Sequence, residues 1–299
     1  MFARLFAESG LSLDRLKALL EVGATGSINK AARGDPVRQS QYSRQIKELE
    51  DFFQAGLVER HGRGIRLTTR GRELARISRF FLLGLSNFQR GCLAEGQSYR
   101  LGSTATFAAC FLLPLLADAR TAQSNVHFQL RPADEDEMER GLHDLTLDFA
   151  FGTRGTLSRP LQTRLLGSWA LQFWVPKSLA KSEKHAVHSL AAKSLPLAWP
   201  QGELEISRFA EFSRLEPALM CSSFVEARSA LEGQAMAAVV PTFLRPGNPD
   251  KFLHVPIPAL EGFALEYHLA WNPRLLRLNP NAEKRRDTLL KALRKMSPA

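Results

Sequence analysis

An amphipathic segment near the N-terminus, VRQSQYSRQIKELE at residues 37–50, constrains the fold more than any other stretch of this chain. Asp35 and Pro36 precede it and favour a helix start, because an N-cap side chain is followed by proline at the first helical position. The apolar residues then recur at steps of four, three and four, which predicts a helix with one buried stripe: Tyr42, Ile46, Leu49 and Phe53. The other face carries Gln, Ser and Arg, so one side is held while the other offers hydrogen-bonding groups.

The segments around this helix complete a recognisable pattern. Residues 13–22 show helical apolar spacing, and Gly23 and Gly26 are expected to stop that helix. Ser27 can cap a short helix over INKAAR, which Gly34 ends. After the long helix, two β-prone runs, LVER and IRLT, flank a basic Gly-rich tip and predict a hairpin. Two short helices, a tight turn and a longer helix form the helix-turn-helix pattern.

A further helix is expected to begin at Thr68 or Thr69 and to reach about residue 88. Its apolar residues recur at three and four and would be exposed on an isolated helix: Leu74, Ile77, Phe81, Leu85 and Phe88. We therefore expect this stripe to pack against another helix, such as its own copy in a dimer. Residues 91–98, GCLAEGQS, are small and polar enough for a linker.

From residue 99 onward, strand-like and helix-like segments alternate. This alternation predicts an α/β domain with a mainly parallel sheet covered by helices. Strands are expected at YRLGS, VHFQLRP, LDFAFG, LQFWVP, LPLAW, ALMCSSF, AMAAVVP and EYHLAW, with a basic helix from Ala282 to about Met296.

The charge of the chain is unevenly distributed. The formal net charge is +10, and residues 1–90 hold 16 Lys and Arg against 9 Asp and Glu. A basic N-terminal segment on a near-neutral body is typical of a phosphate-binding module joined to another domain, although a solvated basic face has the same composition.

Several functional classes find no support in the sequence. No run of 18 apolar residues or signal-peptide pattern is present, so we expect a cytoplasmic protein without membrane association. Cys92, Cys110 and Cys221 are too few and too far apart for a disulfide framework or a zinc module. His185 and His188 lie in a Ser/Lys-rich stretch expected to be a loop, and the acidic run 134–139 is expected to be a solvated helix start. The sequence has no P-loop and no Gly-x-Ser-x-Gly nucleophile motif, and we predict no metal or cofactor. We therefore do not expect an enzyme.

Residues 26–53, followed by LVERHGRGIRLTTRGREL, resemble the N-terminal domain of LysR-type transcriptional regulators. The later segments YRLGSTATFAACFLLPLLADAR, GLHDLTLDFAFG and EGQAMAAVVPTFL are more loosely similar to the effector domain of that family. Arg38 replaces a serine that usually begins the recognition helix, so capping is expected to fall to Asp35. The matching positions in the N-terminal domain are Gly26, Ser27, Ala31, Ala32, Gln39, Ser43, Arg44, Gln45, Ile46, Leu49, Glu50, Arg60, Arg63, Leu67, Thr68 and Gly71.

The resemblance implies an α/β protein with three parts. A winged helix-turn-helix head would occupy residues 1–70, and a dimerisation helix with its hinge residues 71–98. A two-lobed, periplasmic-binding-protein-like effector domain would occupy residues 99–299. Its first lobe is expected at about 99–166 and 268–299, and its second lobe at about 167–267.

The recognition helix would enter the major groove of double-stranded DNA, where Gln can pair with adenine and Arg with guanine. We expect Gln39, Gln41 and Arg44 at or beside the bases. Ser and Lys more often contact phosphate. Phosphate contacts are expected from Arg38, Ser40, Ser43 and Lys47. Arg63 and Arg66 on the wing are expected to meet the DNA backbone or the minor groove, and Ser27 at the preceding turn is a further DNA-binding candidate.

In two-lobed α/β binding domains, ligands lie between the lobes at strand ends and helix N-termini. Ser103 and Thr104, between a strand and a helix, are the first candidates for an effector of unknown identity. The other candidates also follow strands, where ordinary turn residues are an equal alternative: Gly152, Thr153, Trp199, Cys221 and Ser222.

The sequence thus predicts a sequence-specific regulator that binds an imperfect palindrome as a homodimer or homotetramer. A small-molecule effector would control it, and RNA polymerase is a further candidate partner. Two alternatives stay open at this point. One is a DNA-bound regulator whose effector domain is degenerate and independent of ligand, and the other is an enzyme that uses the two-lobed body.

Overall fold

The chain forms two compact units, residues 1–94 and residues 95–299. The computed structural model describes residues 5, 10–62, 64–92, 97–122, 126–233, 235–278 and 280–296. Among these residues, no helix combines the length and the apolar character needed to cross a membrane.

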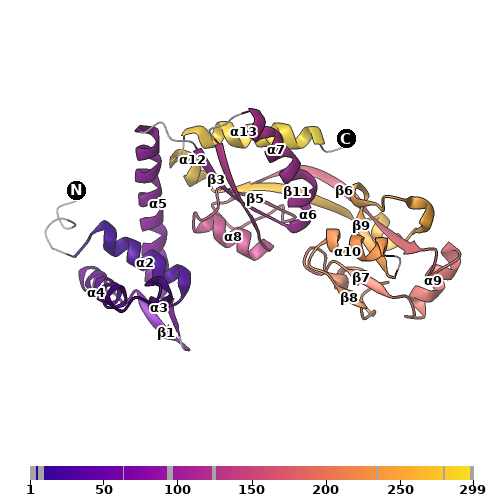
Figure 1. Ribbon diagram of the computed structural model, residues 1–299, viewed down its shortest axis with the longest axis horizontal. Helices are drawn as coiled ribbons and strands as arrows, with labels where there is room; N and C mark the ends of the chain where they lie inside the picture. The colour runs from indigo at the N-terminus through magenta and orange to yellow at the C-terminus, as the bar shows by residue number, and fades with distance from the viewer. Residues whose placement is uncertain are drawn as a thin grey trace. The chain divides into compact units, whose positions relative to one another are not determined.

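The first unit is a helical head with a small hairpin (Figure 1). Leu16, Leu19, Leu49 and Leu57 form its buried core. The hairpin strands are antiparallel and pair Val58 with Leu67, which confirms the predicted wing. In chain order the elements are α2 (Leu13–Thr25), α3 (Ile28–Ala31), α4 (Pro36–Phe53), β1 (Val58–His61), β2 (Gly64–Leu67) and α5 (Thr69–Cys92).

Local capping explains where these helices begin. The Asp35 carboxylate accepts hydrogen bonds from the N–H groups of Val37 at 2.9 Å and Arg38 at 3.4 Å, so Asp35 caps α4 as predicted. Ser27 likewise caps α3 by accepting from the N–H of Lys30 at 3.4 Å. The first turns of both helices therefore have partners for N–H groups that the helix itself leaves unpaired.

Of the two glycines expected to stop the first helix, only Gly26 does so. Gly23 does not stop α2, which continues to Thr25 and ends at Gly26 in the left-handed conformation, with φ of 63°. Gly23 is needed for packing instead, because a Cβ there would approach the Leu67 side chain to 2.7 Å. This glycine allows the wing strand β2 to lie close against α2.

The second unit contains a mixed sheet in which nine strands of the described residues take part. The path of neighbouring strands is β4-β3-β5-β11-β6-β9-β7-β8, and β10 also pairs with β6. The strands are β3 (Gln97–Ser103), β4 (Val126–Pro132), β5 (Phe149–Gly152), β6 (Gln162–Pro176), β7 (Leu197–Trp199), β8 (Leu219–Met220), β9 (Ala237–Pro241), β10 (Phe252–Val255) and β11 (Ala264–Trp271).

Strands β6 and β11 join two lobes of this unit (Figure 1). The first lobe is built on β3, β4 and β5 and the second on β7, β8, β9 and β10. Neighbouring strands are parallel in β3–β4, β3–β5, β7–β8 and β7–β9. The pairs made by β6 and β11 are antiparallel, so the expectation of a mainly parallel sheet was wrong at the centre, where the chain crosses between lobes and returns.

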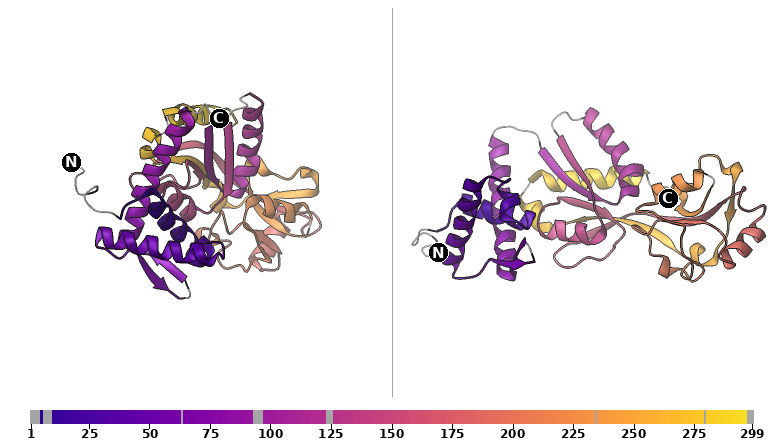
Figure 2. Two further views of the ribbon diagram at one scale, coloured as in Figure 1. Left: turned by 60° about the vertical axis from the view of Figure 1, so that its left-hand side comes forward. Right: turned by 60° about the horizontal axis from the view of Figure 1, so that its bottom comes forward.

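Helices cover both faces of the first lobe. Phe149 and Phe151 point to a core that includes Leu289 and Leu293 of α13 (Pro280–Met296), whereas Ala150 between them packs with residues of α8 (Glu135–His143). A continuous helical segment follows β3 on the α13 face: α6 (Ala105–Phe107), the π-helical η1 (Ala108–Leu112) and α7 (Leu113–Ala122). Figure 2 shows this unit from two further directions.

The remaining helices belong mainly to the second lobe. The stretch with His185 and His188 is a helix rather than the expected loop, because Ser182 caps it by accepting from the N–H of His185 at 3.2 Å. These elements are α9 (Glu183–Ala191), η2 (Ile206–Arg208), α10 (Phe224–Glu232), η3 (Thr242–Leu244), η4 (Pro249–Lys251) and α11 (Pro258–Glu261), with α12 (Pro273–Leu278) leading into α13.

Candidate DNA interface and effector site

Helix α4 presents the side chains that the sequence singled out for DNA contact. Ile46 and Leu49 are buried against the head core, and the residues on the outer side are exposed. The exposed set is Arg38, Gln39, Ser40, Gln41, Ser43, Arg44 and Lys47. The predicted division of this helix into a held face and an open face is therefore present in the structure.

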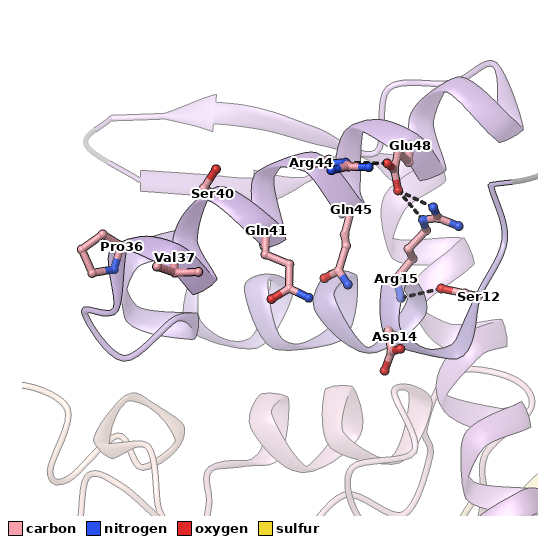
Figure 3. Close-up of a pocket in the computed structure, with 10 residues that line it drawn as sticks. All are labelled: Ser12, Asp14, Arg15, Pro36, Val37, Ser40, Gln41, Arg44, Gln45 and Glu48. Atoms are coloured by element: carbon pink, nitrogen blue, oxygen red, sulfur yellow. Dashed lines mark hydrogen bonds and ion pairs between the residues drawn. The ribbon is translucent and has the colours of Figure 1, made fainter.

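A groove runs along α4 beside the start of α2 (Figure 3). Gln41, Arg44 and Gln45 line it from α4, and Asp14 and Arg15 line it from α2. The amide oxygen of Gln45 is buried and has no hydrogen-bond partner within the described residues. The amide groups of Gln41 and Gln45 both point into the groove, and the exposed Gln41 amide can exchange hydrogen bonds with a ligand there.

Arg44 pairs with the carboxylate of Glu48, a residue that was not among the predicted DNA contacts. Its Nε lies 2.9 Å from Oε1 of Glu48, one helical turn further along, although the Arg44 side chain is 81% exposed. Glu48 also pairs with Arg15 of α2. Hydrogen bonds from Arg44 first, and from Arg15, lower the pKa of the Glu48 carboxyl. The i,i+4 spacing of Arg44 and Glu48 could have revealed the first pair, whereas the second joins residues 33 positions apart.

A second contact fixes α4 against α2. The Tyr42 hydroxyl donates a hydrogen bond to the Glu21 carboxylate. This hydrogen bond is the main reason why the pKa of Tyr42 is raised. The contact anchors the middle of α4 to α2, so it holds the part of the helix that carries the outward side chains.

The remaining predicted DNA contacts lie on the turn and the wing. Ser27 is half-buried and uses its side chain as a cap. Arg66 is exposed on β2 and pairs with Glu59 across the hairpin at 2.6 Å. Arg63 lies outside the described residues. The wing thus presents Arg66 already oriented by a neighbouring carboxylate.

The predicted dimerisation stripe divides into two groups along α5. Leu74 is partly buried against the head core and contributes to that core. Ile77, Phe81, Leu85 and Phe88 are exposed, the last by 74%. Large apolar side chains in such a row are unfavourable in water, because a large part of their apolar area stays exposed.

In the first lobe, Ser103, Thr104 and Gly152 are buried and Thr153 is half-buried. Ser103 donates to the carbonyl of Thr104 at 3.0 Å, and Thr104 caps α6 by accepting from the N–H of Phe107. Thr153 donates from its N–H and its hydroxyl to Glu135 of α8. Gly152 lies under the same carboxylate, whose oxygen a Cβ would approach to 2.6 Å.

In the second lobe, the predicted residues are likewise engaged. Trp199 is fully buried, and its indole N–H donates to the carbonyl of Leu204 at 2.7 Å. Ser222 donates from its N–H and hydroxyl to Glu226, each at 2.8 Å. Burial is the main cause that raises the pKa of the Cys221 thiol. Trp199 and Cys221 are buried in the interior of the lobe, whereas Ser222 is exposed at the start of α10.

Two residues that meet between the lobes were not among the predicted effector residues. The Thr106 N–H, at the start of α6, donates to the Glu203 carboxylate at 2.9 Å. Glu203 follows β7 in the second lobe. Because the two residues are 97 positions apart, no local pattern could have joined them.

Comparison with known families identifies both units. The model of the LysR substrate binding domain matches residues 94–294, and that of the bacterial regulatory helix-turn-helix protein, lysR family, matches residues 13–72. The chain belongs to the LysR family. It is thus a LysR-type DNA-binding transcriptional regulator with an effector domain, and the resemblance seen in the sequence is confirmed.

Three LysR-type proteins with measurable similarity to this chain illustrate the comparison. HTH-type transcriptional regulator HdfR of Yersinia pestis (strain Pestoides F) is 26% identical over 257 residues, which cover 84% of this chain and 88% of HdfR. The crystal structure of ArgP from Mycobacterium tuberculosis has a TM-score of 0.66 at 19% identity and covers 93% of this chain and 96% of ArgP. Full-length CbnR complexed with its target DNA has a TM-score of 0.54 at 18% identity, covering 92% of this chain and 99% of CbnR. These two structures support the fold over nearly the whole chain.

Proposed function

We propose that this LysR-type regulator reads an imperfect DNA palindrome through the exposed face of α4. Gln39, Gln41 and Arg44 would contact base edges or their immediate surroundings. The observation that carries the proposal is the exposed row of donors and acceptors on a helix whose other face is buried. An α-helix fits the major groove, and Gln and Arg can each bond a base bidentately.

Phosphate contacts would come from the basic and hydroxyl side chains that surround the base-reading group. Arg38, Ser40, Ser43 and Lys47 lie on the same exposed surface, and Ser27, Arg63 and Arg66 flank it in the sequence. Such contacts set orientation and register on the duplex without reading its sequence. CbnR, a protein of this fold, has been solved with its target DNA, which supports the same mode of use here.

Recognition of a palindrome requires more than one head. LysR regulators oligomerise, and we propose a homodimer or homotetramer in this case. The exposed residues Ile77, Phe81, Leu85 and Phe88 of α5 offer a continuous apolar surface for a second copy. Two heads related by a two-fold axis would contact two half-sites with opposite orientation.

Control would come from the two-lobed domain, which binds rather than transforms its ligand in this proposal. A small-molecule effector changes the output only in so far as it binds one arrangement of the lobes more tightly than another. The regulator would work in the cytoplasm, where bacterial DNA lies, and RNA polymerase is the partner through which it would act on transcription.

The test is selection of bound sequences from a pool of random duplexes at two salt concentrations. Wild type is compared with Gln41→Ala/Arg44→Ala, and with Arg214→Ala, which removes one exposed positive charge from the effector domain. We expect a palindromic motif for wild type and Arg214→Ala. The double variant should lose it, because each bidentate base contact contributes about 1–3 kcal/mol of discrimination.

Two results would contradict the proposal. A motif retained by the double variant would move base reading to other residues. Binding without any motif, weakened by salt to the same extent in all three proteins, would mean that the head holds only phosphate.

A further inference from the structure

In the effector domain, the side-chain carboxylate of Glu203 lies where two helices from different lobes begin. Oε1 of Glu203 accepts from the N–H of Thr106 in the first turn of the α6–α7 segment, at 2.9 Å. Oε2 accepts from the N–H of Phe224, the first residue of α10, at 3.1 Å. Glu203 therefore bonds the first lobe and the second lobe at the same time.

These two N–H groups are natural anion ligands. The N–H groups in the first turn of a helix lack partners within the helix, and the helix dipole adds positive potential there. A free carboxylate would be stabilised at this point by the same two donors. The Thr106 hydroxyl adds a link between the lobes, because it accepts from the N–H of Phe224 at 3.0 Å.

The loop that carries Glu203 is fixed on several sides. Glu203 and Leu204 both donate their N–H groups to the carbonyl of Pro200 at 2.9 Å. Trp199 holds the far end of the loop through its bond to the Leu204 carbonyl. Gly202 allows the close approach, since a Cβ there would come within 2.2 Å of the Ser222 carbonyl oxygen. The position of Glu203 is thus determined by the backbone around it.

A second feature marks the same place as a polar site. The Tyr267 hydroxyl is fully buried, and no hydrogen bond of regular geometry satisfies it within the described residues. Burial, and after it the negative charge of Glu203, raise the pKa of Tyr267 well above its usual value, and a hydrogen bond of less regular geometry with the Thr104 side chain offsets part of this rise. The amide oxygen of Gln201, two residues before Glu203, is also buried without a partner in the described part of the chain. Buried groups of this kind are costly unless something bonds to them.

We propose that Glu203 is an internal carboxylate ligand that occupies the anion site between the lobes and holds them together in the absence of an effector. The ligand class that fits the site is a small carboxylate. Such an effector would compete with the Glu203 side chain for the N–H groups of Thr106 and Phe224. The domain would therefore rest in a ligand-like arrangement, and an effector would act by replacing an existing contact.

The experiment removes the Glu203 carboxylate by substitution and then supplies a carboxylate from solution. Glu203→Ala removes one methylene and the carboxylate, and acetate supplies an equivalent group. Thermal unfolding of the full chain is followed with increasing sodium acetate and, separately, with sodium chloride at equal ionic strength. We expect the Tm of Glu203→Ala to fall by about 4–8 °C, since two buried donors lose a charged acceptor. Acetate should restore at least half of the loss, and chloride should not.

Two further variants separate charge, space and location. Glu203→Gln keeps the size of the side chain but places an NH₂ group against one of the donors, so its Tm should fall without rescue by acetate. Glu205→Ala removes an exposed carboxylate whose ion pair with Arg208, at 3.5 Å, is exposed on both sides. Its Tm should stay close to that of wild type in both salts.

Three results would overturn the proposal: a Glu203→Ala variant as stable as wild type, a Glu203→Gln variant as stable as wild type, or acetate no more effective than chloride on Glu203→Ala. The role proposed for Glu203 in the response to an effector rests on the proposed function. The thermal test involves no DNA, however, so its failure is distinct from a failure of DNA recognition.

Discussion

The cap of the recognition helix can be tested by two substitutions that separate its hydrogen bonds from its charge. Asp35→Ala removes the acceptor for the N–H groups of Val37 and Arg38, whereas Asp35→Asn keeps an acceptor oxygen and removes only the charge. Loss of a cap costs about 0.5–2 kcal/mol, and loss of a favourable charge at an exposed helix N-terminus costs about 0.3–1 kcal/mol. The Asp35–Arg38 pair, at 3.8 Å and about half exposed, adds little.

The assay is amide hydrogen exchange of the full chain, followed on peptides from α4. A cost of about 1.4 kcal/mol corresponds to tenfold faster exchange in the first turns of the helix. We expect about that acceleration for Asp35→Ala and about two- to fivefold for Asp35→Asn. Asp14→Ala is the control, because Asp14 is an exposed carboxylate in the first turn of α2, where Ser12 provides the cap.

Either of two results would refute the reasoning. Unchanged protection in Asp35→Ala would mean that Pro36 and the packing of α4 determine where the helix begins. Equal effects of Asp35→Ala and Asp35→Asn would assign the stabilisation to charge and not to the hydrogen bonds.

Three further predictions concern packing, protonation and assembly. Gly71→Ala should destabilise the head by about 2–4 kcal/mol in urea unfolding, because its Cβ would lie 2.0 Å from the Leu57 carbonyl oxygen and overpacking against backbone also strains a hydrogen bond. Gly56→Ala, whose Cβ would meet nothing within 4 Å among the described residues, should unfold like wild type. Burial is the first cause that lowers the pKa of His268 below 6.5. Its neutral form therefore contributes stability that is present above the unfolded pKa and lost as pH falls through the folded pKa. Acid unfolding curves should consequently be shallower for His268→Gln, and identical curves would contradict this. Phe81→Glu/Leu85→Glu should yield a smaller species in sedimentation, because charge on the apolar stripe opposes association. Gln89→Glu, on an exposed position of the same helix, should sediment as wild type does. An unchanged double variant would place the interface elsewhere.

The sequence was most informative where a single helix determines the result. The spacing of Tyr42, Ile46 and Leu49 and the Asp35-Pro36 start predicted both the bounds and the exposed face of α4. Within a helix, the spacing of residues in the sequence determines which side chains share a face, because residues three and four apart are neighbours on its surface. The wing followed from the same local reasoning, since its strands are joined by a short Gly-rich turn.

Other features depend on contacts that no local pattern carries. Helix α9 was missed because its cap, Ser182, lies among lysines and histidines that resemble a loop. The central antiparallel pairs were missed because β11 pairs with β6 only after the chain has passed through the second lobe, so the two strands are far apart in the sequence. Glu203 looked like one more surface carboxylate, and its partners lie 97 and 21 positions away.

The two strands that join the lobes limit how the domain can move. Beside the crossing, Tyr267 pairs with Gly167, and a register shift follows before His268 pairs with Leu165. A hydrogen-bonded pair of strands can twist or bend as one ribbon, but sliding would break every bond of the ladder at once. We therefore expect the second lobe to move mainly by rotation about this ribbon. Binding at the site between the lobes would then change the angle between the two lobes and would not slide one lobe past the other.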